Sequence, residues 1–172
     1  MESSTIARKI RANVNQLIQS WAGQVRADPR IKSDAELTQP DLIDHVPAII
    51  DEICQLLEQD EVPSIRNTVE ARANVYTRVN QGYRARDLVR ELSILRITLI
   101  DYVEEIHADR WLGIGSAERQ GASRTINLYL DEEMRHAIAV YTDLSAASAE
   151  GQSTASREPG TSRDRKDGGP DA

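Results

Sequence analysis

The chain has 172 residues and 40% hydrophobic residues, which is enough for one domain with a real core and too short for two ordinary domains. It contains no phenylalanine, so the core must be built mainly from leucine, isoleucine and valine. The formal net charge is −7, and an acidic domain repels phosphate backbones and anionic headgroups, which argues against nucleic acid and membrane surfaces as partners.

Two helices are predicted in the first third of the chain. Apolar residues at intervals of three and four predict a first helix over residues 6–25, and Asp28-Pro29 ends it. A second helical segment begins around Pro40. Pro47 lies inside this segment, so we expect a short opening turn to His45 and a main helix that starts near Pro47.

Three more helices are predicted in the rest of the chain. Ser64 is a good N-cap for a third helix that runs to about Gln81, where Gly82 stops it in a left-handed conformation. The fourth has an unbroken apolar stripe from Leu88 to Ile106 and frays at Trp111. The fifth starts around residue 116 and carries apolar residues as far as 144.

These patterns predict an all-α protein, a single bundle of about five helices, because no segment shows the period-two alternation of a strand. From Ser145 onward the composition shifts to serine, alanine, glycine, proline and mixed charges, which predicts disorder. We therefore expect a helical domain over residues 1–146 and a disordered tail over residues 147–172.

The cysteine content and the N-terminal sequence both favour the cytoplasm. Cys54 is the only cysteine, which excludes an internal disulfide and suits a reducing compartment, and its apolar neighbours predict a buried, inert thiol. Residues 1–21 interleave basic and apolar residues and do not form a signal peptide. No stretch approaches the roughly 20 apolar residues of a membrane span.

Two Glu-x-x-His motifs, Glu104 to His107 and Glu133 to His136, have the pattern found in di-iron helical bundles. If the turn between their helices lies near residue 114, the two histidines of an antiparallel pair are offset by about fifteen residues, or about 22 Å. Their geometry therefore argues against a shared metal site. The chain also shows no Ser-His-Asp set or phosphate-binding glycine loop, and no phenylalanine to line a haem pocket. We expect no catalytic residues, no cofactor and no metal.

The predicted turn between the third and fourth helices carries charged residues that flank the core. Gly82 ends one helix, and Asp87 lies in the first turn of the next, where a carboxylate complements the helix dipole. Glu91 and Arg96 fall beside the leucine stripe, where a charge needs a partner. Arg78 is the candidate partner of Glu91. A corner held by this ion pair and a ligand site are both open interpretations.

The sequence of this turn resembles a known family. The run Arg-x-x-Gln-Gly-Tyr over residues 78–83, followed by Asp-Leu-Val-Arg-Glu-Leu-Ser-Ile-Leu-Arg over residues 87–96, resembles the RsbRD N-terminal domain family. Members of this family are co-antagonists of the RsbT kinase, and the same module precedes bacterial sensor histidine kinases. Residues 21–29 and 42–50 are similar to the opening two helices of the family. The resemblance covers roughly residues 5–145.

The chain departs from the family pattern at two positions. Members often carry a histidine nine residues before the tyrosine, where this chain has Asn74, so a role of that histidine in signal perception would be lost or altered. They often have serine or threonine after the tyrosine, where this chain has Arg84, and the missing cap should cost about 1 kcal/mol. The resemblance marks a structural and signalling corner of eight residues: Asn74, Arg78, Gln81, Gly82, Tyr83, Asp87, Glu91 and Arg96.

The resemblance implies a non-catalytic sensory or regulatory domain of bacterial signal transduction, all-helical and globin-related in shape without haem. Its implied partners are proteins: a STAS protein, a switch kinase or a histidine kinase, together with a second copy in a homodimer. The alternative is a helical bundle that binds a small ligand or a metal, which the two Glu-x-x-His motifs suggest.

Overall fold

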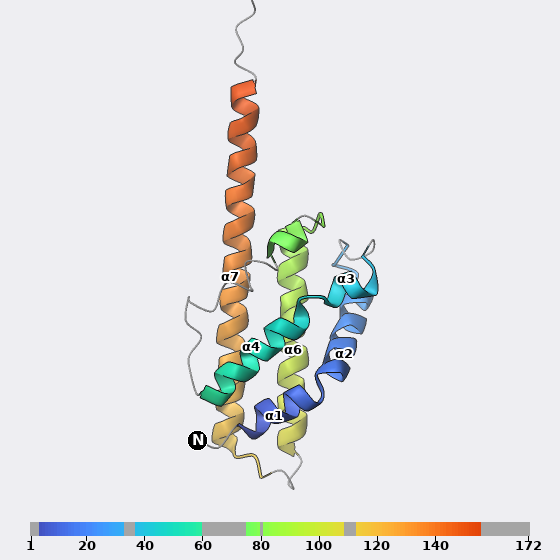
Figure 1. Ribbon diagram of the computed structural model, residues 1–172, viewed down its shortest axis with the longest axis vertical. Coiled ribbons are helices and arrows are strands. Elements are labelled where there is room, and N and C mark those ends of the chain that lie inside the picture. The colour runs from blue at the N-terminus through green and yellow to red at the C-terminus, as the bar shows by residue number, and fades with distance from the viewer. Residues whose placement is uncertain (1–3, 33–36, 60–74, 80, 109–112, 156–172) are drawn as a thin grey trace, which may run out of the picture. The chain divides into compact units, whose positions relative to one another are not determined.

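The computed structural model describes residues 4–32, 37–59, 75–79, 81–108 and 113–155. These residues form helices and the turns between them, without a strand in the described ranges, which confirms the predicted all-α bundle (Figure 1). The chain divides into two units, residues 1–141 and 142–172. The labelled helices are α1 (Thr5–Ala12), α2 (Val14–Ala27), α3 (Gln39–Ile43), α4 (Val46–Gln59), α6 (Ala85–Ala108) and α7 (Ser116–Ala155).

The first helix is broken, and the prediction of one continuous helix over residues 6–25 was wrong at Asn13. In a continuous helix the Asn13 amide would donate to the carbonyl of Lys9. Instead this carbonyl accepts hydrogen bonds from the Asn13 side-chain amide at 3.0 Å and from the Tyr102 hydroxyl at 3.1 Å. The Asn13 amide donates to Ile10 at 3.1 Å, and α2 starts in a new direction at Val14.

The next segment follows the prediction of a short turn and then a main helix. The Thr38 hydroxyl accepts a hydrogen bond from the Asp41 amide at 3.3 Å and so caps the N-terminus of α3, with Pro40 in the first turn. After α3, the main helix α4 begins at Val46, and Pro47 is its second residue. The two prolines therefore lie where the missing amide hydrogen costs nothing.

The last two helices begin as expected, and α7 runs further than expected. It starts at Ser116, but it continues to Ala155, past the predicted end near residue 144. Four of the eleven residues over 145–155 are alanine, which has the highest helix propensity, so the local sequence supports the extra turns. Residues 156–172, Ser64 and Trp111 lie outside the described residues, so the division at residue 146 stays a prediction.

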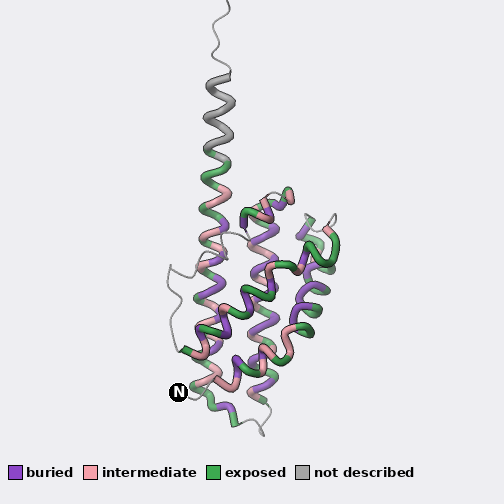
Figure 2. The backbone as a smooth tube through the Cα atoms, viewed as in Figure 1, coloured by how far each residue is buried: buried purple, intermediate pink, exposed green. Residues whose placement is uncertain are grey.

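The core of the unit over residues 1–141 consists mainly of leucine, isoleucine and valine, as the composition predicts. Figure 2 shows the buried positions along its helices. Trp21, Tyr83 and Tyr129 are the large aromatic side chains that are buried with it in the described part of the chain. Glu118 of α7 accepts hydrogen bonds from the Ser4 hydroxyl at 3.2 Å and the Ile6 amide at 3.3 Å, which attaches the N-terminus of α1 to α7. Within the described ranges, no helix has both the length and the hydrophobicity needed to cross a bilayer.

Candidate functional site

The corner begins where the helical residues 75–79 end in a Schellman turn. Gly82 has a φ of +76°, the left-handed conformation predicted for it. Its amide donates to the carbonyl of Val79 at 3.0 Å, and the Tyr83 amide donates to the carbonyl of Arg78 at 2.9 Å. These two bonds satisfy carbonyls that a helix end otherwise leaves open, and they turn the chain toward α6.

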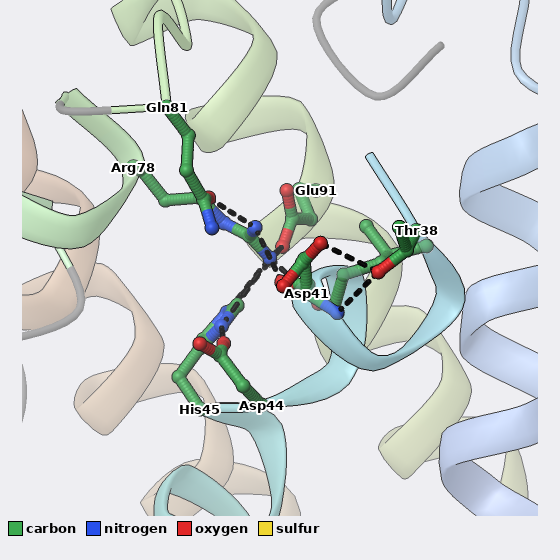
Figure 3. Close-up of polar contacts among 8 residues, drawn as sticks. Thr38, Asp41, Asp44, His45, Arg78, Gln81 and Glu91 are labelled. Carbon is green, nitrogen blue, oxygen red and sulfur yellow. Dashed lines mark hydrogen bonds and ion pairs between the residues drawn. The ribbon is translucent and has the colours of Figure 1, made fainter. Parts of the chain in front are cut away.

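The centre of the corner is an ion pair between Arg78 and Glu91. Nη2 of Arg78 donates to Oε1 of Glu91 at 2.9 Å, and Figure 3 shows the two side chains meeting. The two side chains are 0% and 1% exposed. The pairing predicted from the sequence is therefore confirmed. A charge at such a depth is tolerated only with a close partner and further hydrogen bonds.

Arg78 also holds the C-terminal end of α3. Nη1 donates to the carbonyl of Asp41 at 3.1 Å, and Nη2 donates to the carbonyl of Leu42 at 2.6 Å. Both carbonyls belong to the last turn of a helix, where the dipole is negative and the oxygens lack helical partners. Nη1 donates further to Oε1 of Gln81 at 2.8 Å. One guanidinium thus joins α3, residues 75–79 and α6.

Tyr83 extends the corner toward α7. The guanidinium carbon of Arg78 lies 4.7 Å from the centre of the Tyr83 ring, which is a cation–π contact. The Tyr141 hydroxyl of α7 donates to the Tyr83 carbonyl at 2.7 Å. Burial raises the pKa of Tyr141 to about 12, so its hydroxyl stays protonated and able to donate. The corner therefore contacts four helical segments.

His45 is the residue of this site that the sequence prediction missed. Its Nδ1 lies 2.9 Å from Oδ1 of Asp44, and its Nε2 lies 3.4 Å from Oε1 of Glu91. The hydrogen bond from His45 lowers the pKa of Asp44. Nη2 of Arg78 lies 3.3 Å from Nδ1, and the Trp21 ring meets the imidazole edge-on with centroids 6.4 Å apart. Its position two residues before Pro47, between the short helix α3 and the main helix α4, was the available indication.

Glu91 is held by its backbone as well as by its side chain. Nε1 of Trp21 donates to the Glu91 carbonyl at 3.2 Å. Among the described residues, Oε2 of Glu91 and Nε of Arg78 have no hydrogen-bond partner. The corner therefore keeps one cation and one carboxylate out of water at the joint between α3, residues 75–79 and α6.

Three residues assigned to the corner lie elsewhere or outside the described residues. Asp87 is 1% exposed but accepts from the Lys32 amide at 3.4 Å and from Nε of Arg86 at 3.1 Å. Arg96 forms an ion pair with Asp131 of α7. Asn74 lies outside the described residues. The structure therefore brings together Arg78, Gln81, Gly82, Tyr83 and Glu91, and it adds His45 to them.

The residues of the Glu-x-x-His motifs have separate surroundings. Glu104 is exposed and pairs with Arg119 at 2.6 Å, while Nδ1 of His107 lies 3.1 Å from the Ile114 carbonyl. Glu133 is 3% exposed and lies beside Tyr129. No group of three or more potential metal ligands occurs in the described part of the chain.

Cys54 lies on the buried face of α4. Its sulfur is 3.7 Å from the carbonyl of Ala7, and its side chain is fully buried. Burial raises the pKa of the thiol to about 12, so the thiolate is scarce near neutral pH.

The helical bundle and its buried corner agree with a regulatory domain of the class that the sequence suggests. The family model of the RsbT co-antagonist protein rsbRD N-terminal domain matches residues 15–156, and the chain belongs to this family. Membership makes it a sensory or regulatory domain of stress-response signalling. No curated protein and no solved structure matches the chain. The relation in shape to globins therefore stays a prediction.

Proposed function

We propose that this chain is a non-catalytic sensory or regulatory domain of the bacterial cytoplasm that acts through protein–protein contacts. Its partners in this proposal are a STAS protein, a switch kinase of the RsbT type or a histidine kinase, and a second copy of the chain in a homodimer. The observation that carries the proposal is the family match over residues 15–156.

The corner supports a role in coupling segments rather than in binding a ligand. Each of the two terminal nitrogens of Arg78 donates to protein oxygens: to Asp41, Leu42, Gln81 and Glu91. A guanidinium that binds a phosphate or carboxylate ligand must offer these same nitrogens in a fork. Since they are engaged inside the protein, the corner is better suited to fix α3 and α6 relative to each other.

The acidic charge supports protein partners over nucleic acid or membrane. A formal net charge of −7 repels phosphate-rich surfaces, while it attracts partners with a basic patch and raises their association rates at low salt. We therefore expect partner binding to weaken as the ionic strength rises.

The test is affinity capture of the full chain from a native bacterial lysate, with mass spectrometry of the retained proteins. Two variants accompany it. Glu91→Gln removes the charge of the corner and keeps an acceptor oxygen for Arg78. Gly121→Ala changes a helical surface position of α7 where the added methyl meets nothing within 4 Å, and it serves as the control.

Recovery of a STAS protein, a switch kinase or a histidine kinase by the wild type and by Gly121→Ala supports the proposal. Reduced recovery by Glu91→Gln, in protein that circular dichroism shows to be folded, assigns the coupling role to the corner. Recovery of the bait alone, confirmed by failure to bind purified STAS and kinase proteins, would overturn the proposal.

A further inference from the structure

A second buried polar cluster lies between α4 and α7. The Tyr129 hydroxyl of α7 donates a hydrogen bond to Oε2 of Glu52 on α4. Glu133 follows Tyr129 by four residues, which places it on the same face of α7. Tyr129 and Glu133 are each 3% exposed. A buried carboxyl group and a buried phenol therefore lie together with the partly exposed carboxyl group of Glu52.

This cluster has more hydrogen-bond acceptors than donors. A phenol has one hydrogen, and here Tyr129 gives it to Glu52, so it cannot donate to both carboxyl groups at once. Oε2 of Glu133 has no hydrogen-bond partner among the described residues. An ionised Glu133 must therefore compete with Glu52 for the phenol hydrogen, whereas a protonated Glu133 could itself donate a hydrogen bond to the phenol oxygen.

The titratable groups that act most strongly on Glu133 are acidic or neutral. They are Glu52 from α4, and Tyr129 and Glu132 from α7. Arg135, the adjacent base on α7, forms an ion pair with Glu132. Burial, and after it the charge of Glu52, raises the pKa of Glu133 from 4.5 to about 8, and together they outweigh the hydrogen bond with Tyr129, which lowers it. Burial also raises the pKa of Tyr129, so the phenol keeps its hydrogen.

We propose that Glu133 is a proton-binding site of this domain, which as the neutral acid donates to the Glu52–Tyr129 pair and holds α4 against α7. Loss of this proton to water places a second negative charge beside Glu52 and loosens the contact between the two helices. The state of this contact therefore depends on proton concentration in the neutral to mildly alkaline range. This inference goes beyond the proposed function, because it concerns the response of the domain to pH and not the identity of its partner.

The sign of the effect follows from the two titrations. In the unfolded chain Glu133 loses its proton near pH 4.5, whereas in the folded domain it keeps the proton up to about pH 8. Between these values the folded state binds one more proton than the unfolded state. The free energy of unfolding must therefore decrease as the pH rises through this window.

The experiment compares the full chain with Glu133→Gln and Glu132→Gln. Glutamine at 133 imitates the neutral acid, and Glu132→Gln is the matched control on the neighbouring, partly exposed position. Thermal unfolding midpoints are measured at intervals from about pH 5 to about pH 9. We expect the wild type and Glu132→Gln to lose stability with rising pH, and Glu133→Gln to lose much less.

A direct readout is the carbon NMR titration of the glutamate carboxyl groups, assigned by the Glu133→Gln variant. A Glu133 midpoint near 8 supports the proposal, and a midpoint near 4.5 overturns it. Parallel pH profiles of the wild type and Glu133→Gln also overturn it. If Glu133→Gln does not fold, the Glu133 carboxyl signal of the wild type can be assigned from the backbone resonances. Its titration midpoint then tests the proposal. None of these readouts uses a partner protein, so failure here leaves the proposed function intact.

Discussion

Arg78 and Glu91 meet at 2.9 Å with less than 2% of either side chain in contact with water. The pair links the end of one helical segment to the second turn of the next. Its removal from water is costly, and the hydrogen bonds from Arg78 to the carbonyls of Asp41 and Leu42 offset part of this cost. A lysine could not reproduce this set, because it lacks the planar fork of donors.

The energetic link between the two residues can be measured with a double-mutant cycle. We expect Arg78→Met to lower the free energy of unfolding by about 3–5 kcal/mol, because it leaves the Glu91 carboxylate buried without its partner. Glu91→Gln should cost about 1–3 kcal/mol. Chemical denaturation of the double variant should show a loss smaller than the sum by about 0.5–3 kcal/mol, and strict additivity would contradict direct coupling.

Gly82→Val should destabilise the domain through its backbone. Gly82 has a φ of +76°, and a Cβ added there would meet nothing within 4 Å beyond its chain neighbours, so the cost arises in the local backbone and not in contacts with the rest of the domain. We expect a loss of about 1–2 kcal/mol, measured by thermal or urea unfolding. Gly121→Ala, in the helical interior of α7, is the matched control and should gain about 0.5–1 kcal/mol. Equal behaviour of the two variants would show that the turn does not need a left-handed residue.

Acid should weaken the contacts of Asp28, the residue that follows α2, with Arg30 and Arg90. Hydrogen bonds from the side chain and amide of Arg30, and from Arg90, hold the pKa of Asp28 well below its usual 3.8. Since the folded state favours the ionised form, this contribution to stability is present above about pH 3.8 and is lost as the pH falls below it. Asp28→Asn should flatten the decline of urea midpoints below pH 4.

The control for this titration is Asp101→Asn, at an exposed position of α6. It should retain the acid decline of the wild type. If Asp28→Asn retained the same decline, then the ionised form of Asp28 would not be favoured by folding.

Cys54 should be unreactive in the folded domain. Its thiol is fully buried, and burial raises its pKa to about 12, so both access and thiolate content are low. We expect labelling by a thiol reagent near pH 8 to be slow in native protein and fast in denaturant. Fast labelling of the native protein would mean that α4 separates from α1 often.

The sequence predicted the elements that depend on local chemistry. The prolines at 40 and 47 mark the starts of α3 and α4, and Gly82 marks the end of a helix. The ion pair of Arg78 and Glu91 was predictable because both residues flank the same turn, thirteen positions apart. In each case the residues that determine the feature lie close together in the sequence.

What the sequence did not reveal depends on distant contacts. The break at Asn13 requires the hydroxyl of Tyr102, which is 89 positions away, to reach the Lys9 region. The role of His45 likewise depends on Glu91 being folded next to it. Glu133 appeared as half of a metal-binding motif, and only its burial beside Tyr129 distinguishes it from an exposed acid.

The indole of Trp21 gives the corner an optical reporter of its own. Its Nε1 donates to the Glu91 carbonyl, and its ring stands edge-on to His45, so its emission will respond to any displacement of either residue. The chain has two tryptophans, and replacing Trp111 with phenylalanine leaves Trp21 as the single tryptophan, which can be excited selectively over the five tyrosines. Movement at the joint can then be followed in real time, in unlabelled protein, while a partner or a change of conditions is applied.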